Sequence, residues 1–444
     1  MVSVELIHLP RKCYYRLAHF LLHADECQSE PMKSLLRQCY RQLRAQLLQR
    51  IIPTSHTQLP NDGALCIEVL GFFHSISGIG ESARLCAQQL AADGYRVKCT
   101  SVEKFFRKPL ELEWNWPDNI SSADINCRIY HLNPPMLPPV ILQMGLANFK
   151  TTYNIGYWAW ELESIPAEWI KAIRYMNAIM TPSRFTTKVI QGYTDYPVLT
   201  VTHPVTRATA TDGMRAHLDI PESAFLVSTI FSFGSALERK NPMGLINAFK
   251  QAFVGIDDAY LLLKSNAGAD SPEKQALLEA IAGHPNIRVI DQHWSRADVL
   301  GLIQCSDLYA SLHRSEGFGL TIAEAMLLDT PALVTSWSGN MDFCTAENSF
   351  LVPYKPIKVN SSHPEFLEFT QATWADADVP HTAQLFTEIY RNRSLLRDKQ
   401  ACCANDMQAC INSNKYQHAL QQLANHQAAE KTHQKWNAND KLAE

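Results

Sequence analysis

Residues 313–326 read His-Arg-Ser-Glu-Gly-Phe-Gly-Leu-Thr-Ile-Ala-Glu-Ala-Met, and this stretch decides the fold of the chain. The Gly317–Gly319 loop runs directly into a helix-forming segment that should begin near Leu320. The first N–H groups of a helix lack partners within it and its dipole is positive there, so the loop suits a phosphate. Glu316 and Glu324 are about 12 Å apart along a straight helix. They would therefore serve different ends of a long ligand such as a nucleotide-sugar.

A second Gly-x-Gly unit, Gly78-Ile79-Gly80, also lies between an apolar run and a helical pattern. No other unit of this kind occurs among the 18 glycines of the chain. An ordinary helix-entry loop would explain either one alone. Two of them, one in each half, favour two domains that bring their loops to one ligand.

Size and composition narrow the class of protein. A chain of 444 residues exceeds a single hydrophobic core, and a net charge of −4 gives no reason to expect nucleic-acid binding. The twelve cysteines include no Cys-x-x-Cys pair, so neither a zinc ribbon nor a disulfide framework is indicated. The first residues lack a secretory signal, and no 18 apolar residues run together. We therefore expect a cytoplasmic protein without a membrane span.

Apolar runs alternate with helical patterns through most of the chain, which is typical of parallel sheets with crossover helices. We expect a helical extension (1–60), a first Rossmann-like domain (61–205), a second Rossmann-like domain (206–382), and helices with a polar tail (383–444). Predicted strands lie at 65–73, 127–132, 153–160, 176–181 and 198–202, then near 224–231, 259–264, 287–290, 307–311, 331–335 and 350–352. Ligands of such sheets bind beyond the carboxyl ends of the strands, so the domains should face one another across a cleft.

The amino-terminal extension carries a basic stripe. Over residues 32–52 apolar positions recur at helical spacing beside Lys33, Arg37, Arg41 and Arg44. Two interpretations stay open. The helix lies on an anionic membrane surface as a peripheral contact, or it packs on its own domain with a solvated basic face.

Two adjacent cations, Arg239 and Lys240, follow the first expected strand of the second half. Arg239 can bind phosphate oxygens through two N–H groups and Lys240 as a point charge. Basic neighbours in a loop are usually just solvated, but this place after a strand favours a diphosphate site. Lys264, at the end of the next strand, is a further candidate for the same ligand.

Together, these cations and the Glu316 to Glu324 stretch resemble the family-four retaining glycosyltransferases, or group 1 glycosyl transferases, of the GT-B fold. Three further segments resemble bacterial members that build surface polysaccharides: Gly156-Tyr157-Trp158-Ala159-Trp160-Glu161-Leu162-Glu163, Thr181-Pro182-Ser183-Arg184-Phe185, and Ser336-Trp337-Ser338-Gly339-Asn340-Met341-Asp342-Phe343. The resemblance covers roughly residues 65–360. It implies transfer of a hexosyl unit, with retention, from a nucleotide-diphosphate sugar to a glycan or lipid-linked acceptor in cell-surface polysaccharide assembly.

The resemblance also implies roles for individual residues. Glu324 would bind the ribose and Glu316 the transferred sugar, while Arg239 and Lys240 would bind the diphosphate. The backbone at Gly317, Phe318, Gly319 and Leu320 would hold the sugar and phosphate, and Gly78 and Gly80 would approach the donor from the first domain. Fixed positive charge can stabilise the departing diphosphate, so we expect neither a metal nor a cofactor besides the nucleotide-sugar.

The chain departs from the family pattern at two places. Many relatives carry an arginine where this chain has Ser235, so Arg239 is expected to take its place. Many also carry a histidine after the strand that here ends near Glu161, which makes Glu161 the first candidate for acceptor contact. Further acceptor-side candidates are His74, His131, Trp158 and Trp160, although a lone histidine or two tryptophans at strand spacing are as often structural.

Other functions stay open at this stage. Gly78-Ile79-Gly80-Glu81-Ser82-Ala83 also satisfies the dinucleotide fingerprint Gly-x-Gly-x-x-Ala, with Glu103 as a candidate for the ribose. An NAD-dependent enzyme would, however, leave Glu316 and Glu324 without a role. A nucleotide-sugar epimerase and a non-catalytic sugar-binding subunit are the remaining alternatives.

Overall fold

The computed structural model describes residues 47–55, 57–60, 65–117, 119–266, 268 and 270–440, with side chains of the last helix described as far as residue 428. Most of the predicted extension over 1–60, including residues 32–46 of the basic helix, lies outside these residues. The end of that helix is described, and residues 47–51 are helical. Residues 53–55 and 57–60 then have no regular secondary structure.

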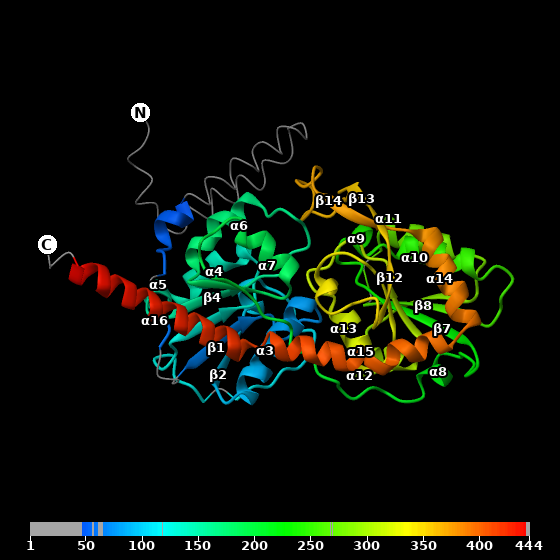
Figure 1. Cartoon of the computed structure of the whole chain (residues 1–444), viewed down its shortest axis with the longest axis horizontal. Coiled ribbons are helices and arrows are strands. Elements are labelled where there is room, and N and C mark those ends of the chain that lie inside the picture. Colours follow the sequence, from blue (N-terminus) through cyan, green and yellow to red (C-terminus); the bar gives the residue numbers. More distant parts are fainter. Residues whose placement is uncertain are drawn as a thin grey trace.

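The first domain is built on a six-stranded parallel sheet of order β2-β1-β3-β4-β5-β6 (Figure 1). Its strands are β1 (Cys66–Gly71), β2 (Arg96–Ser101), β3 (Cys127–Tyr130), β4 (Tyr153–Tyr157), β5 (Ala178–Thr181) and β6 (Val198–Thr200). The connecting helices are α3 (Gly78–Ala92), α4 (Leu137–Met144), α5 (Leu146–Lys150), α6 (Ala167–Ala172) and α7 (Arg184–Gln191), with 3-10 turns η3 (Glu103–Phe105), η4 (Pro134–Met136) and η5 (Ile173–Tyr175). Five of the six strands coincide with predicted ones, and β2 was not among the predicted strands.

The second domain repeats the plan with a six-stranded sheet of order β12-β11-β10-β7-β8-β9. Its strands are β7 (Phe225–Ile230), β8 (Ala259–Ser265), β9 (Ile287–Asp291), β10 (Leu308–Ser311), β11 (Ala332–Thr335) and β12 (Ser349–Val352). Its helices are α8 (Met214–His217), α9 (Leu237–Lys240), α10 (Pro242–Ala252), α11 (Pro272–Ile281), α12 (Arg296–Cys305) and α13 (Leu320–Leu327), with the turn η6 (Gly339–Asp342). The expected pair of Rossmann-like domains is confirmed.

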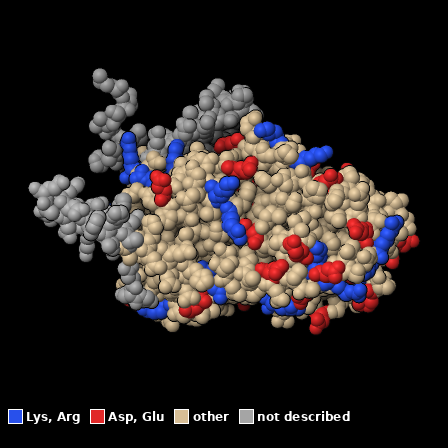
Figure 2. All heavy atoms as spheres, viewed as in Figure 1, with Lys and Arg blue, Asp and Glu red and all other residues tan. Residues whose placement is uncertain are grey.

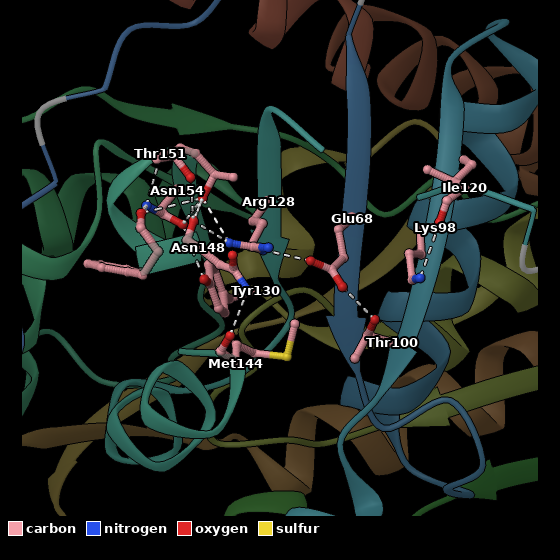
Figure 3. A network of polar contacts seen from close by, with 12 residues as sticks. Glu68, Lys98, Thr100, Ile120, Arg128, Tyr130, Met144, Asn148, Thr151 and Asn154 are labelled. Atoms are coloured by element: carbon pink, nitrogen blue, oxygen red, sulfur yellow. Dashed lines mark hydrogen bonds and ion pairs between the residues drawn. The ribbon is translucent and has the colours of Figure 1, made fainter. Parts of the chain in front are cut away.

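A buried polar network crosses the first sheet (Figure 3). Glu68 of β1 accepts hydrogen bonds from Arg128 Nε of β3 and from Thr100 Oγ1 of β2, each at 2.6 Å. Arg128 also donates to the carbonyl of Asn148 at 2.7 Å. Both members of the Glu68–Arg128 pair are buried, so losing either partner would leave an unpaired charge inside the protein. The pair thereby fixes the register of three neighbouring strands.

The last helices join the two domains. α14 (Val379–Arg391) and α15 (Ser394–Ser413) pack on the second domain, and α16 (Tyr416–Asp440) crosses back to α3 of the first (Figure 1). Tyr416, Leu420 and Leu423 of α16 belong to the apolar core beneath the first sheet. The first domain therefore includes residues from the far end of the chain.

A second connection is an antiparallel hairpin that was not predicted. We call residues 354–377 the arm; it comprises β13 (Tyr354–Lys358), β14 (Thr373–Ala377) and the segment between them. At its base Asp376 pairs with Arg314 of the second domain at 2.8 Å. Further out, the ring of Phe366 packs on Trp160 of the first domain, with centroids 6.1 Å apart. The arm thus bridges the two domains.

Three further features bear on function. No helix among the described residues is long and apolar enough to cross a bilayer. Nor do the described residues contain a group of three or more His, Cys, Asp and Glu side chains that could hold a metal ion. On the face shown in Figure 2, basic and acidic side chains are interspersed.

Candidate functional site

The two Gly-x-Gly loops lie beyond the carboxyl ends of their sheets and approach each other between the domains. A Cβ added at Gly78 would be 3.6 Å from Leu320 Cδ1, and one added at Gly317 would be 3.3 Å from the carbonyl of Trp160. Ser183 Oγ of the first domain also donates to the carbonyl of Gly317 at 2.6 Å. The predicted meeting of the loops is therefore observed.

The two loops differ at their helix starts. Gly319 has φ 98°, a left-handed conformation that favours glycine, and no side chain caps the helix α13 that follows it. The start of α3 is different, because Ser77 Oγ accepts a hydrogen bond from the N–H of Gly80. The buried side chain of Phe318 packs between His203 and Phe343. Of the two helices that follow the Gly-x-Gly loops, α13 is therefore the one whose start has no side-chain cap, as an anion site requires.

Gly80 is required by packing inside the first domain. A Cβ at this position would lie 2.6 Å from the carbonyl oxygen of Phe72 and 2.7 Å from that of Ser75. Those carbonyls are backbone atoms that cannot move aside easily. The expected donor contact of Gly80 is thus replaced by a steric role, whereas Gly78 faces the opposite domain.

Glu316 and the two predicted cations form one cluster. Lys240 Nζ is 2.5 Å from Glu316 Oε1, and Arg239 Nη1 is 3.4 Å from Glu316 Oε2. Burial by itself raises the pKa of Glu316, but Lys240 and Arg239 outweigh burial and lower the pKa to about 2. Burial lowers the pKa of Lys240, an effect that Glu316 partly offsets. The carboxylate is ionised, and Lys240 remains part-exposed toward a ligand.

Arg239 reaches across the domain boundary. Its Nη2 is 3.5 Å from Glu161 Oε1 of the first domain, and its Nη1 donates to the carbonyl of Ser315 at 2.8 Å. Ser315 Oγ in turn donates to the carbonyl of Glu161. Two predicted site residues, Arg239 and Glu161, are thereby brought together. Arg239 would have to exchange these partners for phosphate oxygens to bind a diphosphate.

Glu365 of the arm faces the same cluster. Burial, together with the nearby carboxylate of Glu161, raises the pKa of Glu365 to about 7, and Arg239 acts in the opposite direction. The side chain is nevertheless exposed to solvent. No sequence motif pointed to this third carboxylate near Arg239.

Glu324 lies in α13 with one satisfied oxygen and one orphaned oxygen. Its Oε1 is 2.9 Å from Arg296 Nη2, while its buried Oε2 has no hydrogen-bond partner among the described residues. Burial raises the pKa of Glu324, although Arg296 opposes the rise. The same Arg296 nitrogen is 3.5 Å from Glu81 Oε1 of the first domain. Arg296 was missed by the sequence analysis because no motif marks it.

Lys264 was predicted to bind the diphosphate, but the structure does not place it at the site. The side chain is fully buried, and its ammonium donates to the carbonyls of Gln292, at 2.7 Å, and Ser265 and to Asn266 Oδ1. Burial lowers the pKa of Lys264 to about 8. All three donors hold the ends of β8 and β9 together, so none is left for a phosphate.

Three acceptor-side candidates are core residues. Trp158, Trp160 and His131 are fully buried, so none of them can stack on or bind a sugar in this conformation. Trp160 Nε1 donates to the carbonyl of Ser164 at 2.7 Å. Burial lowers the pKa of His131 well below its ordinary value, and its ring stacks on Tyr157. The structural interpretation of these residues is therefore correct.

His74 and Glu103 support a loop of the first domain. Glu103 is fully buried and accepts hydrogen bonds from the N–H of His74, at 2.6 Å, and from Ser101 Oγ. The His74 ring contacts the carbonyl of Leu112 at 3.0 Å. Both Glu103 oxygens thus accept hydrogen bonds from within the protein, so neither is left to bind the ribose of NAD, as the NAD interpretation requires.

Other polar motifs near the site also have structural partners. Ser235 Oγ donates to the carbonyl of Ser232 at 2.8 Å. The expectation of no metal site overlooked an Asp-x-Asp sequence, Asp376-Ala377-Asp378. Its two carboxylates are used, since Asp376 pairs with Arg314 and Asp378 caps α14 by accepting from the N–H of His381.

The segment Ser336–Phe343 shapes the donor loop from behind. Ser338, at φ 76°, accepts a hydrogen bond from the N–H of Glu316 at 2.8 Å. A Cβ at Gly339 would lie 2.3 Å from the carbonyl oxygen of Gly317. The resemblance had drawn attention to this segment without assigning it a role. Its role here is to position Glu316.

A family model matches the segment of the chain that contains the site residues of the second domain. Residues 227–359 match the model of a family described as "Glycosyl transferases group 1". The match runs from β7 into the arm and contains Arg239, Lys240, Glu316 and Glu324. It confirms the resemblance inferred from the sequence. The comparison with curated proteins found no significant match.

Solved structures share the fold at low sequence identity. Anabaena HepE in complex with UDP-glucose is 15% identical, with a TM-score of 0.56 over 82% of this chain and 100% of that one. Sucrose-phosphate synthase from Thermosynechococcus elongatus is 13% identical, with a TM-score of 0.55 over 84% and 100%. Pneumococcal O-GlcNAc transferase GtfA in complex with UDP and GlcNAc is 14% identical, with a TM-score of 0.48, and this chain covers 58% of its length with 68% of its own. The first two likenesses establish the GT-B fold.

Proposed function

We propose that this chain, whose second domain carries the group 1 glycosyl transferase segment, transfers a hexosyl unit from a nucleotide-diphosphate sugar with retention of configuration. The acceptor is a glycan or a lipid-linked glycan of cell-surface polysaccharide assembly. One observation carries the proposal. Lys240 pairs with Glu316 just before the uncapped start of α13, the helix that carries Glu324, in the second of two Rossmann-like domains.

The nucleoside half of the donor is assigned to Glu324. Its orphaned Oε2 is an acceptor, and a ribose hydroxyl is a donor of the right kind. A buried acceptor without a partner costs about 1–3 kcal/mol, which a bound hydroxyl would recover. Glu316, held by the N–H contact with Ser338, is assigned to hydroxyls of the transferred sugar.

The diphosphate is assigned to Lys240, Arg239 and the first N–H groups of α13. Negative charge grows on this group as the glycosidic bond breaks, and fixed positive charge stabilises it without reorganisation. Neither a metal nor another cofactor is required by this scheme. The acceptor hydroxyl attacks from the face that the diphosphate leaves, and the departing phosphate takes its proton. Glu161 and Glu365 are the carboxylates nearest the acceptor side.

The site of action is assigned to the cytoplasm. The basic stripe over 32–52 would bring the enzyme to an anionic membrane surface, where lipid-linked acceptors are held. Liposome flotation tests this part. Binding that persists unchanged after deletion of residues 1–60 would refute it.

A panel of nucleotide-sugars tests the central claim. The full chain is incubated with UDP- and GDP-linked glucose and mannose, and slow hydrolysis is followed by release of the nucleotide. We expect one donor to be hydrolysed and to give the anomer of the donor. Binding of NADH with no nucleotide-sugar turnover would refute the assignment, and an epimerised donor would indicate the epimerase instead.

A further inference from the structure

A pocket of about 590 Å³ opens at the edge of the first sheet that faces away from the donor loops. It lies at the amino ends of β4, β5 and β6, between residues 55, 57 and 58, the loop 193–197 and helix α16. We call it the amino-edge pocket. Its lining residues are Ser55, Thr57, Gln58, Tyr153, Asn177, Tyr193, Thr194, Asp195, Tyr196, Pro197, Leu423, His426 and Gln427.

The lining combines aromatic faces with hydrogen-bonding groups. Tyr193 and Tyr196 stand on one loop with 39% and 37% of their surface exposed, and the exposed Asp195 lies between them. Hydroxyl and amide side chains make up most of the rest. None of the described lining residues is a lysine or an arginine, and Asp195 is the one carboxylate among them.

Several of these groups are held in place by the protein. Asn177 donates to the carbonyl of Thr57 at 3.1 Å, and Gln427 Oε1 accepts from the N–H of Leu59 at 2.8 Å. Thr194 Oγ1 accepts from the N–H of Tyr196 at 3.0 Å, which fixes the loop. Asn177 Oδ1 also accepts from the N–H of Asn154 at 2.8 Å. Asn177 is thus held at both amide atoms with one N–H of its amide group left over, and Gln427 is held through its oxygen. Such prior positioning lowers the entropic cost of binding.

We propose that the amino-edge pocket binds a neutral carbohydrate chain. A phosphate or other anion is disfavoured, because the described lining offers a carboxylate and neither a lysine nor an arginine, with His426 as its one histidine. A sugar ring has apolar faces that suit the two tyrosines and hydroxyls that suit the carboxylate and amides. The volume falls within the range of small-molecule sites, about 300–1,000 Å³.

This site is separate from the donor site. The amino-edge pocket lies at the amino end of β4, and the donor loops lie beyond its carboxyl end. β4 has five residues, so these two ends are about 16 Å apart. A glycan held at the amino-edge pocket would raise the local concentration of a long acceptor chain at the enzyme. The binding itself does not depend on the proposed transfer reaction.

Saturation-transfer NMR and calorimetry on the full chain test the proposal, with maltopentaose, cellopentaose and mannopentaose as probes. Saturating UDP occupies the donor site, and a repeat without UDP should give the same affinity. We expect one probe to bind, and Tyr196→Ala to weaken its binding at least about fivefold, since stacking on an aromatic side chain is worth about 1–3 kcal/mol per nucleobase in single-stranded nucleic-acid sites. Tyr193→Ala is the second test of the same loop.

Matched variants keep the outcome interpretable. Tyr196→Phe keeps the ring and loses only the hydroxyl, so it should bind more tightly than Tyr196→Ala and lose at most about tenfold relative to the native protein, since a neutral hydrogen bond contributes about 0.5–1.5 kcal/mol. Leu367→Ala removes an exposed side chain from the arm and should have no effect. Failure of all three probes to bind overturns the proposal. Equal binding by native protein and both tyrosine-to-alanine variants also overturns it, because the sugar would then lie elsewhere.

Discussion

Glu324→Gln should weaken nucleotide binding while stabilising the free protein. Native Glu324 offers a buried anionic acceptor, and the variant offers a neutral group of the same shape. Hydrogen bonds to charged groups contribute about 1.5–3 kcal/mol and neutral ones about 0.5–1.5 kcal/mol, so the difference is about 1.4 kcal/mol, or about tenfold in Kd. In the free protein, burial disfavours the charged form of Glu324, so neutralising it should raise the unfolding temperature.

Calorimetric titration with UDP and with 2′-deoxy-UDP measures the first effect. The native protein should distinguish the two ligands, and the variant should distinguish them less. Asp329→Asn is the control, because it removes a surface ion pair with Arg207 just beyond the other end of α13. Unchanged UDP affinity combined with a lower unfolding temperature would show that Glu324 is a structural residue and refute the reasoning.

Three other variants follow from the site. Lys240→Met should lower kcat/KM about 10²–10³-fold, because it removes a cation from the diphosphate site and leaves Glu316 without its closest partner. A nucleotide-release assay measures kcat/KM, and a decrease of less than about threefold would contradict this prediction. The pKa of Glu316 is lowered to about 2, so the stability that it contributes is present above its unfolded pKa and is lost as pH falls. The urea midpoint should therefore fall more steeply between about pH 5 and about pH 3 in the native protein than in Glu316→Gln. Trp160→Ala should cost about 3–5 kcal/mol of stability because the residue is core; a stable variant with only weaker acceptor binding would contradict this assignment.

Much of the fold was predictable because the strands are buried on both faces and read as continuous apolar runs. β1 and β7 are almost wholly buried, and apolar residues dominate both, although Glu68 interrupts the run in β1. β2 reads Arg-Val-Lys-Cys-Thr-Ser and lies at the sheet edge, where only one of its residues is fully buried. Its sequence therefore lacks an apolar run. The arm was missed for a related reason, since its strand β13 is largely exposed.

The site was predictable where function depends on backbone geometry and sequence spacing. The loop before α13, Glu316 and Lys240 lie together as expected. Lys264 was misassigned because a charge at a strand end looks the same in sequence whether it faces a ligand or is buried against carbonyls. Arg296 and Glu365 lie outside the motifs recognised in the sequence, and only the tertiary structure brings them to the site.

The arm and α16 make the first domain discontinuous in sequence, which affects how it can fold. Phe366 and Trp374 complete one apolar cluster of that domain, and Tyr416 and Leu423 complete another. During synthesis the amino-terminal lobe emerges first, yet its cores can close only after the last helix has left the ribosome. Until then, its unpaired apolar surface would be open to chaperones and to aggregation.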